Sequence, residues 1–434
     1  MMALCAALLV ASHADAAEYF VASDGDNANA GTKEKPFATV QHAQEAVAPG
    51  DTVIIRGGKY LMREEQIARR NRGWAYVTLL DKSGTKEKPI TYKAADGERP
   101  VFDLSNVKPQ GLRVHAFQVN GSWLHIIGLE VVGVQVTAKG HTQSICFASD
   151  GNHNIYERLS MHDGQAIGIY SQRGADNLFL NCDAYNNWDY TSENQKGGNV
   201  DGFGCHPIKG ATGNVFRGCR AWFNSDDGYD CISAHEAVIF ENCWAFYNGT
   251  NAKSERLADG NGFKAGGFGS LEADRLPNPI PRHTVRFCLA VGNRASGFYA
   301  NHQPGGGDWF NNTAYRNGTN FNMLCRLADN KTDVDGYGQK LRNNLSFKSR
   351  ADLAKFDATK SDAANNSFTL DLKPNVEDFL SLDEGELMRP RQANGDLPVI
   401  NFLHLAEKSS LRDKGVDIGF PFKGARPQLG AFER

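Results

Sequence analysis

The sequence has little net charge and almost no long apolar runs. Its 434 residues carry 47 Lys and Arg against 50 Asp and Glu, which leaves a formal net charge of −3. This balance supplies no basic field for nucleic acid and no polybasic patch for a membrane surface. After residue 17 no apolar stretch approaches the length of a transmembrane helix, so the mature protein is expected to be soluble. Its partners must therefore be recognised by local sites.

The apolar run at the start, Ala3 to Ala11, precedes Ala14-Asp15-Ala16, a small-residue pattern of the kind that signal peptidases cleave. The run is too short to span a bilayer, and no Lys or Arg precedes it. Residues 1–17 predict a signal peptide. We therefore expect a secreted protein, either extracellular or periplasmic. We also expect it to be a monomer.

Long amphipathic helical patterns are also missing from the middle of the chain, which carries an internal repeat instead. Five segments share an alanine followed three places later by an asparagine. Counted from a fainter copy at Ser160, successive copies are 24, 37, 24, 45 and 24 residues apart, a basic period of 24 with insertions. The five pairs are Ala184 and Asn187, Ala221 and Asn224, Ala245 and Asn248, Ala290 and Asn293, and Ala314 and Asn317.

A period in the low twenties, with short β-prone runs between Gly and Asn, is typical of coils built from three short strands and three turns. Stacked coils form an all-β fold, a right-handed parallel β-helix, in which like residues lie about 4.8 Å apart. The repeated asparagines should then form a ladder at one turn, because Asn tolerates the left-handed conformation and bonds neighbouring backbone.

Eight cysteines remain after the expected signal peptide, an even number that would allow disulfides in a secreted protein. Four of them stand two places before a repeated alanine and should point into the coils, where free cysteine behaves as a small hydrophobic residue. Neighbouring pairs could bridge, but the sequence favours an unbridged stack of Cys182, Cys219, Cys243 and Cys288.

Both ends of the coils are expected to be capped. Residues 38–47 have apolar positions at the spacing of a short amphipathic helix, which would shield the open end of the core, and a first strand should follow at 52–56. The repeat is lost from about residue 350, where we expect loops, short helices and a tail that packs back through Leu429. We predict one domain over 18–434, with an N-terminal cap over about 18–60, coils over about 75–350 and a C-terminal cap over about 351–434.

A second repeat, a glycine followed by an aromatic residue, places charged residues in register. Because neighbouring strand residues point to opposite faces, inward aromatics would leave Asp230 and Lys264 outward on adjacent coils. Asp201 and Asp227, each one place before the glycine, should stack in the same way, with Asp226 beside them. The copies are Gly202-Phe203, Gly228-Tyr229, Gly262-Phe263 and Gly297-Phe298.

Four carboxylates at strand spacing, those of Asp201, Asp226, Asp227 and Asp230, would repel one another unless a positive charge lay among them. Ca²⁺ accepts about 6 to 8 oxygen ligands in a flexible geometry and is the natural cation for such a site. Asp-Asp-Gly alone is common in surface turns. Its recurrence in register with Asp201 favours the metal site.

Lys264 lies among glycines, where a substrate chain could approach the backbone closely. It could be a solvated lysine paired with Asp230. A lysine beside a divalent cation should, however, have a lowered pKa, so that the neutral amine is available as a base. A base and Ca²⁺ together are what β-elimination from a uronate requires.

The three cassettes around these residues resemble the signature of family 9 of the polysaccharide lyases, whose founding members are calcium-dependent pectate lyases on a right-handed parallel β-helix. The resemblance runs from Pro36 to the terminus and so covers nearly the whole mature chain. It implies that the four aspartates bind Ca²⁺, that Lys264 is the Brønsted base, and that the substrate is an acidic pectic polysaccharide such as polygalacturonate. The cassettes are Asp201-Gly-Phe-Gly, Asn224-Ser-Asp-Asp-Gly-Tyr-Asp230 and Asn261-Gly-Phe-Lys-Ala-Gly-Gly.

The sequence departs from the pectate-cleaving pattern at Cys205-His206-Pro207, where Pro-Lys is expected. Other branches of the family resemble rhamnogalacturonan I lyases, so this polymer is an alternative substrate. His206 is either a substrate-binding or acid–base group or a turn residue. Further candidates for substrate binding lie near the expected groove, since Arg suits carboxylates and aromatic rings suit sugar faces. They are Arg294, Tyr299, His302 and Arg326.

Two other functions compete with a lyase. A β-helical polygalacturonase-type hydrolase also presents aspartates on one face, as an acid and base pair, but it would not require Lys264. A non-catalytic glycan-binding β-helix would keep the asparagine ladder and the caps. It has no reason to gather four aspartates and a lysine.

Overall fold

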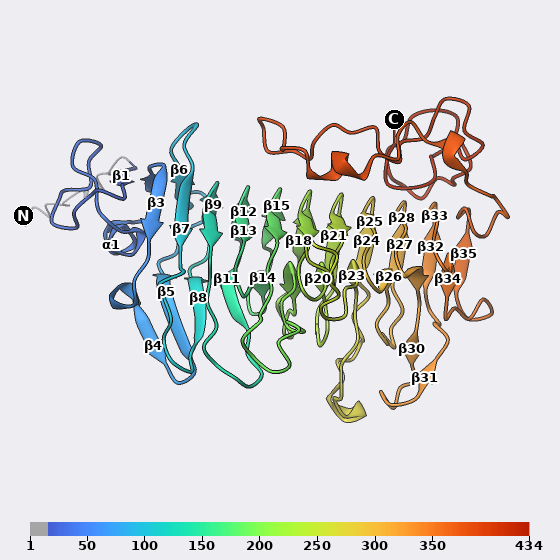
Figure 1. Cartoon of the computed structure of the whole chain (residues 1–434), viewed down its shortest axis with the longest axis horizontal. Coiled ribbons are helices and arrows are strands. Elements are labelled where there is room, and N and C mark those ends of the chain that lie inside the picture. The colour runs from blue at the N-terminus through green and yellow to red at the C-terminus, as the bar shows by residue number, and fades with distance from the viewer. Residues whose placement is uncertain (1–15, 434) are drawn as a thin grey trace, which may run out of the picture.

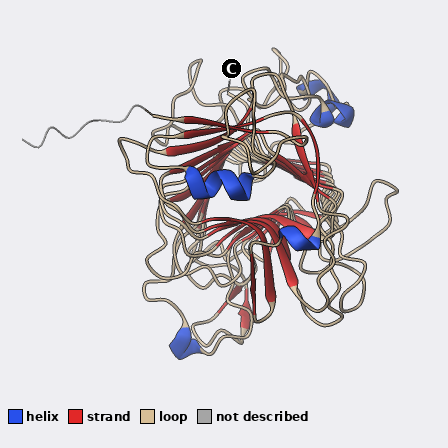
Figure 2. Cartoon of the chain, turned by 90° about the vertical axis from the view of Figure 1, so that its left-hand side faces the viewer, coloured by secondary structure: helices blue, strands red, loops and turns tan. Residues whose placement is uncertain are grey.

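The computed structural model describes residues 16–433, so the predicted signal peptide at 1–17 lies almost wholly outside the described residues. Within them the chain winds into stacked coils, and three long sheets run along the solenoid (Figure 1). Seen along the axis, the strands form three walls around the core (Figure 2). The predicted all-β, parallel β-helix architecture is confirmed.

Sheet A has 12 strands, and every neighbouring pair in it is parallel. Its order along the solenoid is β1 (Glu18–Val21), β2 (Thr52–Ile55), β6 (Ile90–Ala94), β9 (Leu124–Ile127), β12 (Ile155–Glu157), β15 (Leu178–Leu180), β18 (Asn214–Arg217), β21 (Val238–Glu241), β24 (Thr284–Arg286), β27 (Asp308–Phe310), β32 (Lys340–Arg342) and β35 (Asp362–Ala364).

Sheet B has 10 strands, again all parallel. They are β3 (Gly58–Leu61), β7 (Pro100–Asp103), β10 (Glu130–Val132), β13 (Ser160–His162), β16 (Asp183–Tyr185), β19 (Arg220–Trp222), β22 (Trp244–Phe246), β25 (Leu289–Val291), β28 (Thr313–Tyr315) and β33 (Leu345–Phe347).

Sheet C, which carries the predicted site, has 11 strands, parallel except for the first pair. They are β4 (Arg69–Asn71), β5 (Trp74–Leu80), β8 (Arg113–Val119), β11 (Ser144–Ser149), β14 (Ala166–Ser171), β17 (Phe203–Cys205), β20 (Tyr229–Asp230), β23 (Phe263–Lys264), β26 (Ser296–Tyr299), β29 (Thr319–Asn322) and β34 (Leu353–Ala354). A small antiparallel pair, β30 (Cys325–Arg326) with β31 (Asp333–Val334), projects beyond this sheet in Figure 1.

The inner face of sheet C is a row of stacked aromatic rings. Phe203, Tyr229, Phe263, Phe298 and Phe321 are all fully buried, and their ring centroids follow one another at 4.9, 4.6, 5.2 and 4.9 Å. Burying these rings supplies much of the hydrophobic stabilisation of the coils. Because side chains alternate along a strand, the residue after each ring faces outward.

The predicted asparagine ladder is confirmed, although for a different reason. Each side-chain amide donates to the next carbonyl oxygen up the stack, at 3.1 Å from Asn187 to Asn224 and at 3.1 Å from Asn224 to Asn248. The left-handed residue at this turn is the one before the ladder position, as at Phe223 (φ 52°) and Tyr247 (φ 56°). Asn is therefore selected for its two donors and its acceptor rather than for its backbone conformation.

The eight described cysteines are all buried and free, which confirms the unbridged stack. Cys243 illustrates the packing, since its backbone N–H lies 3.4 Å from the sulfur of Cys288 on the next coil. These thiols act as small core side chains.

The helical caps also follow the prediction. α1 (Val40–Ala46) begins at Thr39, whose hydroxyl accepts from the His42 N–H at 3.1 Å, and it buries Val40 and Ala43 against the first coils. Over residues 16–433 no helix combines the length and apolar character needed to cross a membrane. The remaining helical turns are η1 (Glu64–Gln66), η2 (Ala273–Arg275), η3 (Val376–Asp378) and η4 (Glu384–Met388).

The tail after β35 turns back and lies along the outer face of sheet B (Figure 1). Leu387, Phe402 and Leu429 of the tail pack in one cluster with Phe246 and Val291 of the sheet, as the tail residues were expected to do. Two short strands, β34 and β35, lie beyond residue 350, where the repeat is weaker in the sequence.

Candidate active site

The structure brings the predicted aspartates and the lysine together on the outer face of sheet C. Asp230 of β20 and Lys264 of β23 are direct partners in the parallel ladder. The Lys264 ammonium nitrogen lies 3.1 Å from a carboxylate oxygen of Asp230 and 3.1 Å from one of Asp227. The glycine–aromatic register therefore placed these side chains correctly.

The other carboxylates occupy the turn before each strand. Their geometry is fixed by the backbone of the following coil: Asp201 accepts from the Asp227 N–H at 3.1 Å, and Asp226 accepts from the Asp259 N–H at 3.0 Å. Asp227 accepts from both the backbone and the side-chain amide of Asn261. Such bonds hold carboxylates in place that would otherwise repel one another.

All four aspartates are buried, with exposed fractions of 0 to 5%. Burial, followed by repulsion from neighbouring carboxylates, raises the pKa of Asp201 and of Asp226 well above the usual range. Burial also raises the pKa of Asp227, although Lys264 acts in the opposite direction. One lysine therefore does not balance the negative charge of the cluster.

At Lys264 the neighbouring charges, rather than burial, determine the direction of the pKa shift. Burial alone would lower the pKa of its ammonium group, but the charges of Asp227 and Asp230, together with the other two aspartates, outweigh burial and hold that pKa well above its usual value. In this state Lys264 is protonated and is not a base. A second positive charge among the carboxylates would remove that constraint.

The donor set suits a hard divalent cation. One carboxylate oxygen from each of Asp201, Asp226 and Asp227 lies within 4.8 Å of the others, and Asp201 and Asp230 form a second such group with His206. Oxygen-rich, anionic and partly pre-positioned, the cluster matches the preference of Ca²⁺.

His206 lies at this site rather than in a remote turn. One ring nitrogen, Nδ1, donates to the Ile232 carbonyl oxygen at 2.6 Å, so in the neutral ring the other, Nε2, carries the lone pair. Nε2 is buried and has no hydrogen-bond partner among the described residues. Burial lowers the pKa of His206, which favours a neutral ring with an acceptor aimed at the cluster.

The remaining predicted residues fall into two groups. Tyr299 pairs with Lys264 in the ladder, and its hydroxyl lies 3.4 Å from Nδ1 of His302, so both border the cluster. Arg294 and Arg326 are tied to loops: Arg294 donates to the Ala258 carbonyl, and Arg326 donates to the Gly269 carbonyl at 2.7 Å. Their first role in this structure is to hold the loops beside the site.

Sequence reasoning missed Tyr170, which pairs with Gly204 in the ladder and so lies in the same outward row as Asp230, two strands away. Its ring stacks on His206 with centroids 4.8 Å apart. Burial and the charges of Asp230 and Asp201 raise the pKa of Tyr170 to about 12. The signal was present in Gly168-Ile-Tyr170, a copy of the glycine repeat in which Ile169 replaces the inward aromatic.

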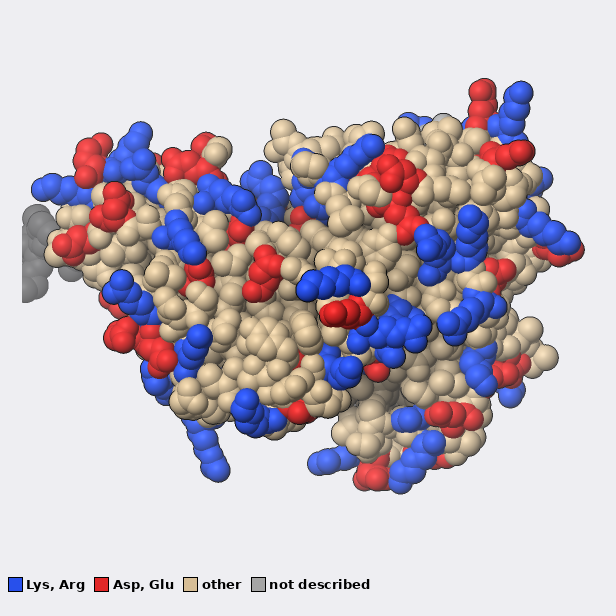
Figure 3. Space-filling view, viewed as in Figure 1, with Lys and Arg blue, Asp and Glu red and all other residues tan. Residues whose placement is uncertain are grey.

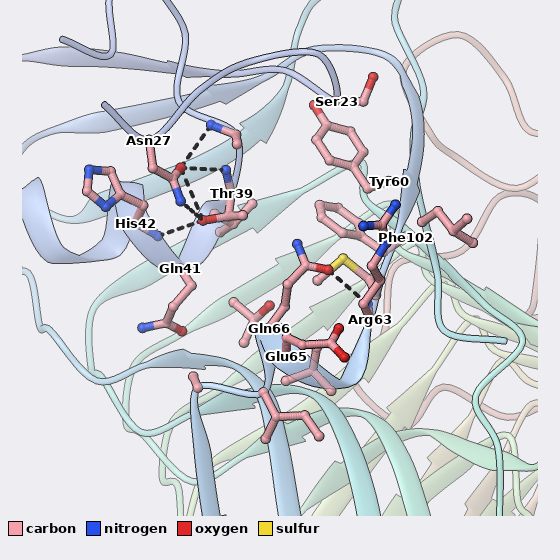
Figure 4. Close-up of a pocket in the computed structure, with 18 of the residues that line it drawn as sticks. Ser23, Asn27, Thr39, Gln41, His42, Tyr60, Arg63, Glu65, Gln66 and Phe102 are labelled. Atoms are coloured by element: carbon pink, nitrogen blue, oxygen red, sulfur yellow. Dashed lines mark hydrogen bonds between the residues drawn. The ribbon is translucent and has the colours of Figure 1, made fainter. Parts of the chain in front are cut away.

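A cavity of about 860 Å³ lies elsewhere, at the N-terminal end, between α1 and η1 (Figure 4). Its polar side chains mostly bond their own neighbours: the Asn27 carbonyl accepts from the Ala38 and Thr39 N–H groups, and Gln66 accepts from the Arg63 N–H. It is lined by residues before 103, at the first coils, and is separate from the acidic cluster.

Comparison with known proteins relates almost the whole described chain to lyases. Residues 19–344 match the family model "Pel9A-like, right handed beta helix region", and residues 357–425 match "Rhamnogalacturonan lyase-like, C-terminal". A curated relative, pectate lyase L of Dickeya dadantii, is 32% identical over 423 residues, which are 96% of this chain and 90% of that protein.

Two solved structures are similar over almost the whole chain. A rhamnogalacturonan lyase matches with a TM-score of 0.86 and 47% identity, covering 90% of this chain and 96% of that one. Pectate lyase Pel9A matches with a TM-score of 0.79 and 30% identity, covering 97% of both chains.

The fold and these similarities define the class of protein, a polysaccharide lyase built on a right-handed parallel β-helix. The chain belongs to the Pel9A-like β-helix family, which confirms its resemblance to family 9 of the polysaccharide lyases.

Proposed function

We propose that the enzyme cleaves a pectic polysaccharide by calcium-dependent β-elimination, with Lys264 as the base. The observation that carries this proposal is the contact of the Lys264 ammonium with two carboxylates, at 3.1 Å each, inside a buried cluster whose negative charge exceeds what a lysine can balance. A hydrolase would need only a pair of carboxylates. A binding protein would need neither the lysine nor the unbalanced charge.

Asp201, Asp226, Asp227 and Asp230 would hold the cation. When bound, Ca²⁺ would neutralise the cluster and polarise the uronate carboxylate, which makes the proton on the adjacent carbon, C5, more acidic. Neutral Lys264 would accept that proton, and the C5–H electron pair would form the C4–C5 double bond as the C4–O bond breaks. The departing oxygen would keep the C4–O electron pair and take a proton from solvent water. The products are a shortened chain and an unsaturated uronate.

Tyr170, His206 and Tyr299 would orient the sugar. The Nε2 atom of His206, which has no hydrogen-bond partner among the described residues, can accept a hydrogen bond from a sugar hydroxyl. The hydroxyl of Tyr299, one ladder step from Lys264, can donate to the substrate. The neutral ring of His206 also places no additional positive charge beside Lys264.

The substrate is proposed to be a polymer of galacturonate such as polygalacturonate, because the pectate lyases are similar over nearly the full chain. A second candidate is the rhamnogalacturonan backbone. It is favoured by the 47% identity to a rhamnogalacturonan lyase, and by His206 at the position where pectate-cleaving relatives are expected to have lysine.

The decisive assay incubates the purified protein with polygalacturonate and, separately, with rhamnogalacturonan, and follows the ultraviolet absorbance of the unsaturated product. We expect absorbance to rise with one of them, to stop in a calcium chelator and to recover when Ca²⁺ is restored. Chain shortening without absorbing product would identify a hydrolase. Binding without shortening would identify a glycan-binding protein.

Export and the monomeric state are proposed alongside. Export is supported by the pattern of residues 1–17 and by the extracellular location of pectic polymers. Sequencing the amino terminus of protein recovered from the medium or periplasm tests it, with a new terminus near residue 18 as the expected result. Size-exclusion chromatography with light scattering tests the monomer.

A further inference from the structure

A second hollow lies on the same outer face of sheet C, towards the N-terminal end of the solenoid. Its volume is about 440 Å³, and its lining comes from the strands β5, β8, β11 and β14 and the turns beside them. In Figure 1 these strands precede β20 and β23 along the sheet. The hollow is therefore in line with the acidic cluster.

The ladder register makes this continuity explicit. One outward row of side chains runs from Gln118 through Ala148, Tyr170 and Gly204 to Asp230, and Lys264 comes next. From β8 to β20 there are four strand steps, about 19 Å at the usual spacing. That is the length of several sugar residues in an extended polysaccharide.

The charge of the hollow is opposite to that of the cluster. Three arginines line it, Arg72, Arg113 and Arg173, against one carboxylate, that of Asp150. Asp150 is already engaged by Arg173 at 3.2 Å and by the Gln118 amide at 3.0 Å. Within residues 16–433, Arg72 and Arg113 form no ion pair, so both guanidinium groups remain available to carboxylates.

On the face drawn in Figure 3, positive and negative side chains are mixed. The net charge of the whole chain, −3, would not attract an acidic polymer. Attraction must come from local groups of arginines such as this one.

The hollow also offers flat apolar surfaces. The Trp74 ring is 37% exposed, with the Arg113 guanidinium 5.8 Å from its centroid, and the Tyr76 ring lies 5.3 Å from that of His115. Ile145, Ala148 and Ile167 form a small apolar cluster on the outer face, and Tyr170 packs against it. Aromatic and apolar faces of this kind suit the C–H faces of sugar rings.

We propose that this hollow is a remote binding site for the acidic polysaccharide substrate, with Arg72 and Arg113 on uronate carboxylates and Trp74 against a sugar ring. The inference rests on the proposed function. It adds that one stretch of the polysaccharide is bound several sugar residues away from the glycosidic bond that breaks. Long substrates therefore gain affinity that short ones cannot.

The test compares Arg113→Gln with the wild type on a polymer and on the shortest oligomer that is cleaved. For the polymer we expect the KM to rise about tenfold, since a charge-assisted hydrogen bond is lost, with kcat unchanged. For the short oligomer both constants should stay the same. Trp74→Ala is the second variant and should show the same length-dependent pattern if Arg113→Gln does not fold.

Arg56→Gln is the matched control, because Arg56 is exposed at the end of β2 in sheet A and lines neither site. It should leave both KM values unchanged. A shift of KM that is equal for long and short substrates, or no shift for the polymer, overturns the remote site. Absence of unsaturated product from the wild type itself would instead overturn the proposed function, and polymer binding by Lys264→Ala, with and without Arg113→Gln, would still decide the remote site.

Discussion

Asp183 on sheet B and the acidic cluster on sheet C differ in how far positive side chains balance their carboxylates. Asp183 of β16 lies between Arg220 and Arg391, whose nitrogen atoms approach its oxygens at 2.7 and 2.6 Å. Burial alone would raise the pKa of Asp183, but the two guanidinium groups outweigh burial and lower it. At the acidic cluster on sheet C, a single lysine faces four aspartates, and the pKa of Asp201 and of Asp226 is raised.

The difference shows what each group is for. The Asp183 pair joins sheet B to the C-terminal tail, because Arg391 comes from the tail and also donates to the Gly218 carbonyl at 2.9 Å. It is complete without any ligand. The acidic cluster carries an excess of negative charge, which destabilises the fold unless a cation such as the proposed Ca²⁺ balances it. The ion pairs of Asp183 are balanced by the protein alone, whereas the charge of the cluster is not.

The largest effect is expected when the lysine is removed. Lys264→Ala should lower kcat by about 10³-fold, because a general base typically contributes a factor of 10² to 10⁴. The absorbance assay for unsaturated product measures this, and the fold can be checked by circular dichroism.

Lys340→Ala serves as its control, since Lys340 is exposed on sheet A, away from the cluster. It should retain wild-type activity. Lys264 would not be the base if Lys264→Ala kept more than about a tenth of the wild-type kcat, because the loss of a general base should lower kcat much further.

Breaking the balanced ion pairs of Asp183 should destabilise the protein more than breaking an exposed ion pair. Arg391→Met leaves Asp183 with one partner and removes the clamp on the tail, so the free energy of unfolding should fall by about 3 kcal/mol. Arg217→Met removes an exposed arginine paired with Glu241 at 2.7 Å and should cost at most about 1 kcal/mol. Equal losses for the two variants in urea titrations would contradict this account of the clamp.

The fold was more predictable from the sequence than the site. The spacing of alanine, asparagine and glycine–aromatic pairs follows directly from one coil per repeat, so the ladder, the cysteine stack and the register of Asp230 with Lys264 could all be predicted. Beyond residue 350 the signal is weaker: β35 holds Ala363 three places before Asn366, but neither residue of β34 is followed by such an asparagine. That residues 18–434 form one domain stays a prediction.

The surroundings of the cluster could not be predicted, because they depend on loops and on outward side chains that the repeat does not constrain. Arg294 and Arg326 were expected to face the substrate on residue type alone, yet they bond loop carbonyls. Tyr170 and the hollow around Arg113 depend on strands that precede the cassettes by one to four coils. Residue type indicates what a side chain can bind, while its register determines what it meets.

Replacing a single Asp by Asn should change the stability of the protein in opposite directions at the acidic cluster and at Asp183. Asp226→Asn keeps the oxygen that accepts from Asp259 but removes one charge from the cluster. In a chelator this variant should be more stable than the wild type, since it no longer buries a charge that the neighbouring carboxylates repel. Asp183→Asn, the matched change in the balanced group, should instead destabilise.

Adding Ca²⁺ should reverse the order of stability of the wild type and Asp226→Asn. The wild type should gain thermal stability when Ca²⁺ is added, because a ligand that binds only the folded state stabilises it, and Asp226→Asn should gain less. Isothermal titration calorimetry would give the matching loss of affinity. A wild type that neither binds Ca²⁺ nor is stabilised by it would remove the cation from the proposed function.

The most specific effect concerns the pH dependence of stability. With a raised pKa, folded Asp226 keeps its proton above 3.8, the usual value, where the unfolded chain has lost it, so stability falls as pH rises from there. In a chelator the wild type and Asp226→Asn should therefore differ little near pH 4 and diverge towards neutral pH, by up to about 1.4 kcal/mol per pH unit. For Asp183, whose pKa is lowered, the stabilisation is present above 3.8 and is lost as pH falls below it. Thermal melts of the wild type, Asp226→Asn and Asp183→Asn from pH 4 to 7 measure both trends. Parallel curves of stability against pH for the wild type and Asp226→Asn would show that burial and repulsion do not raise the pKa of Asp226.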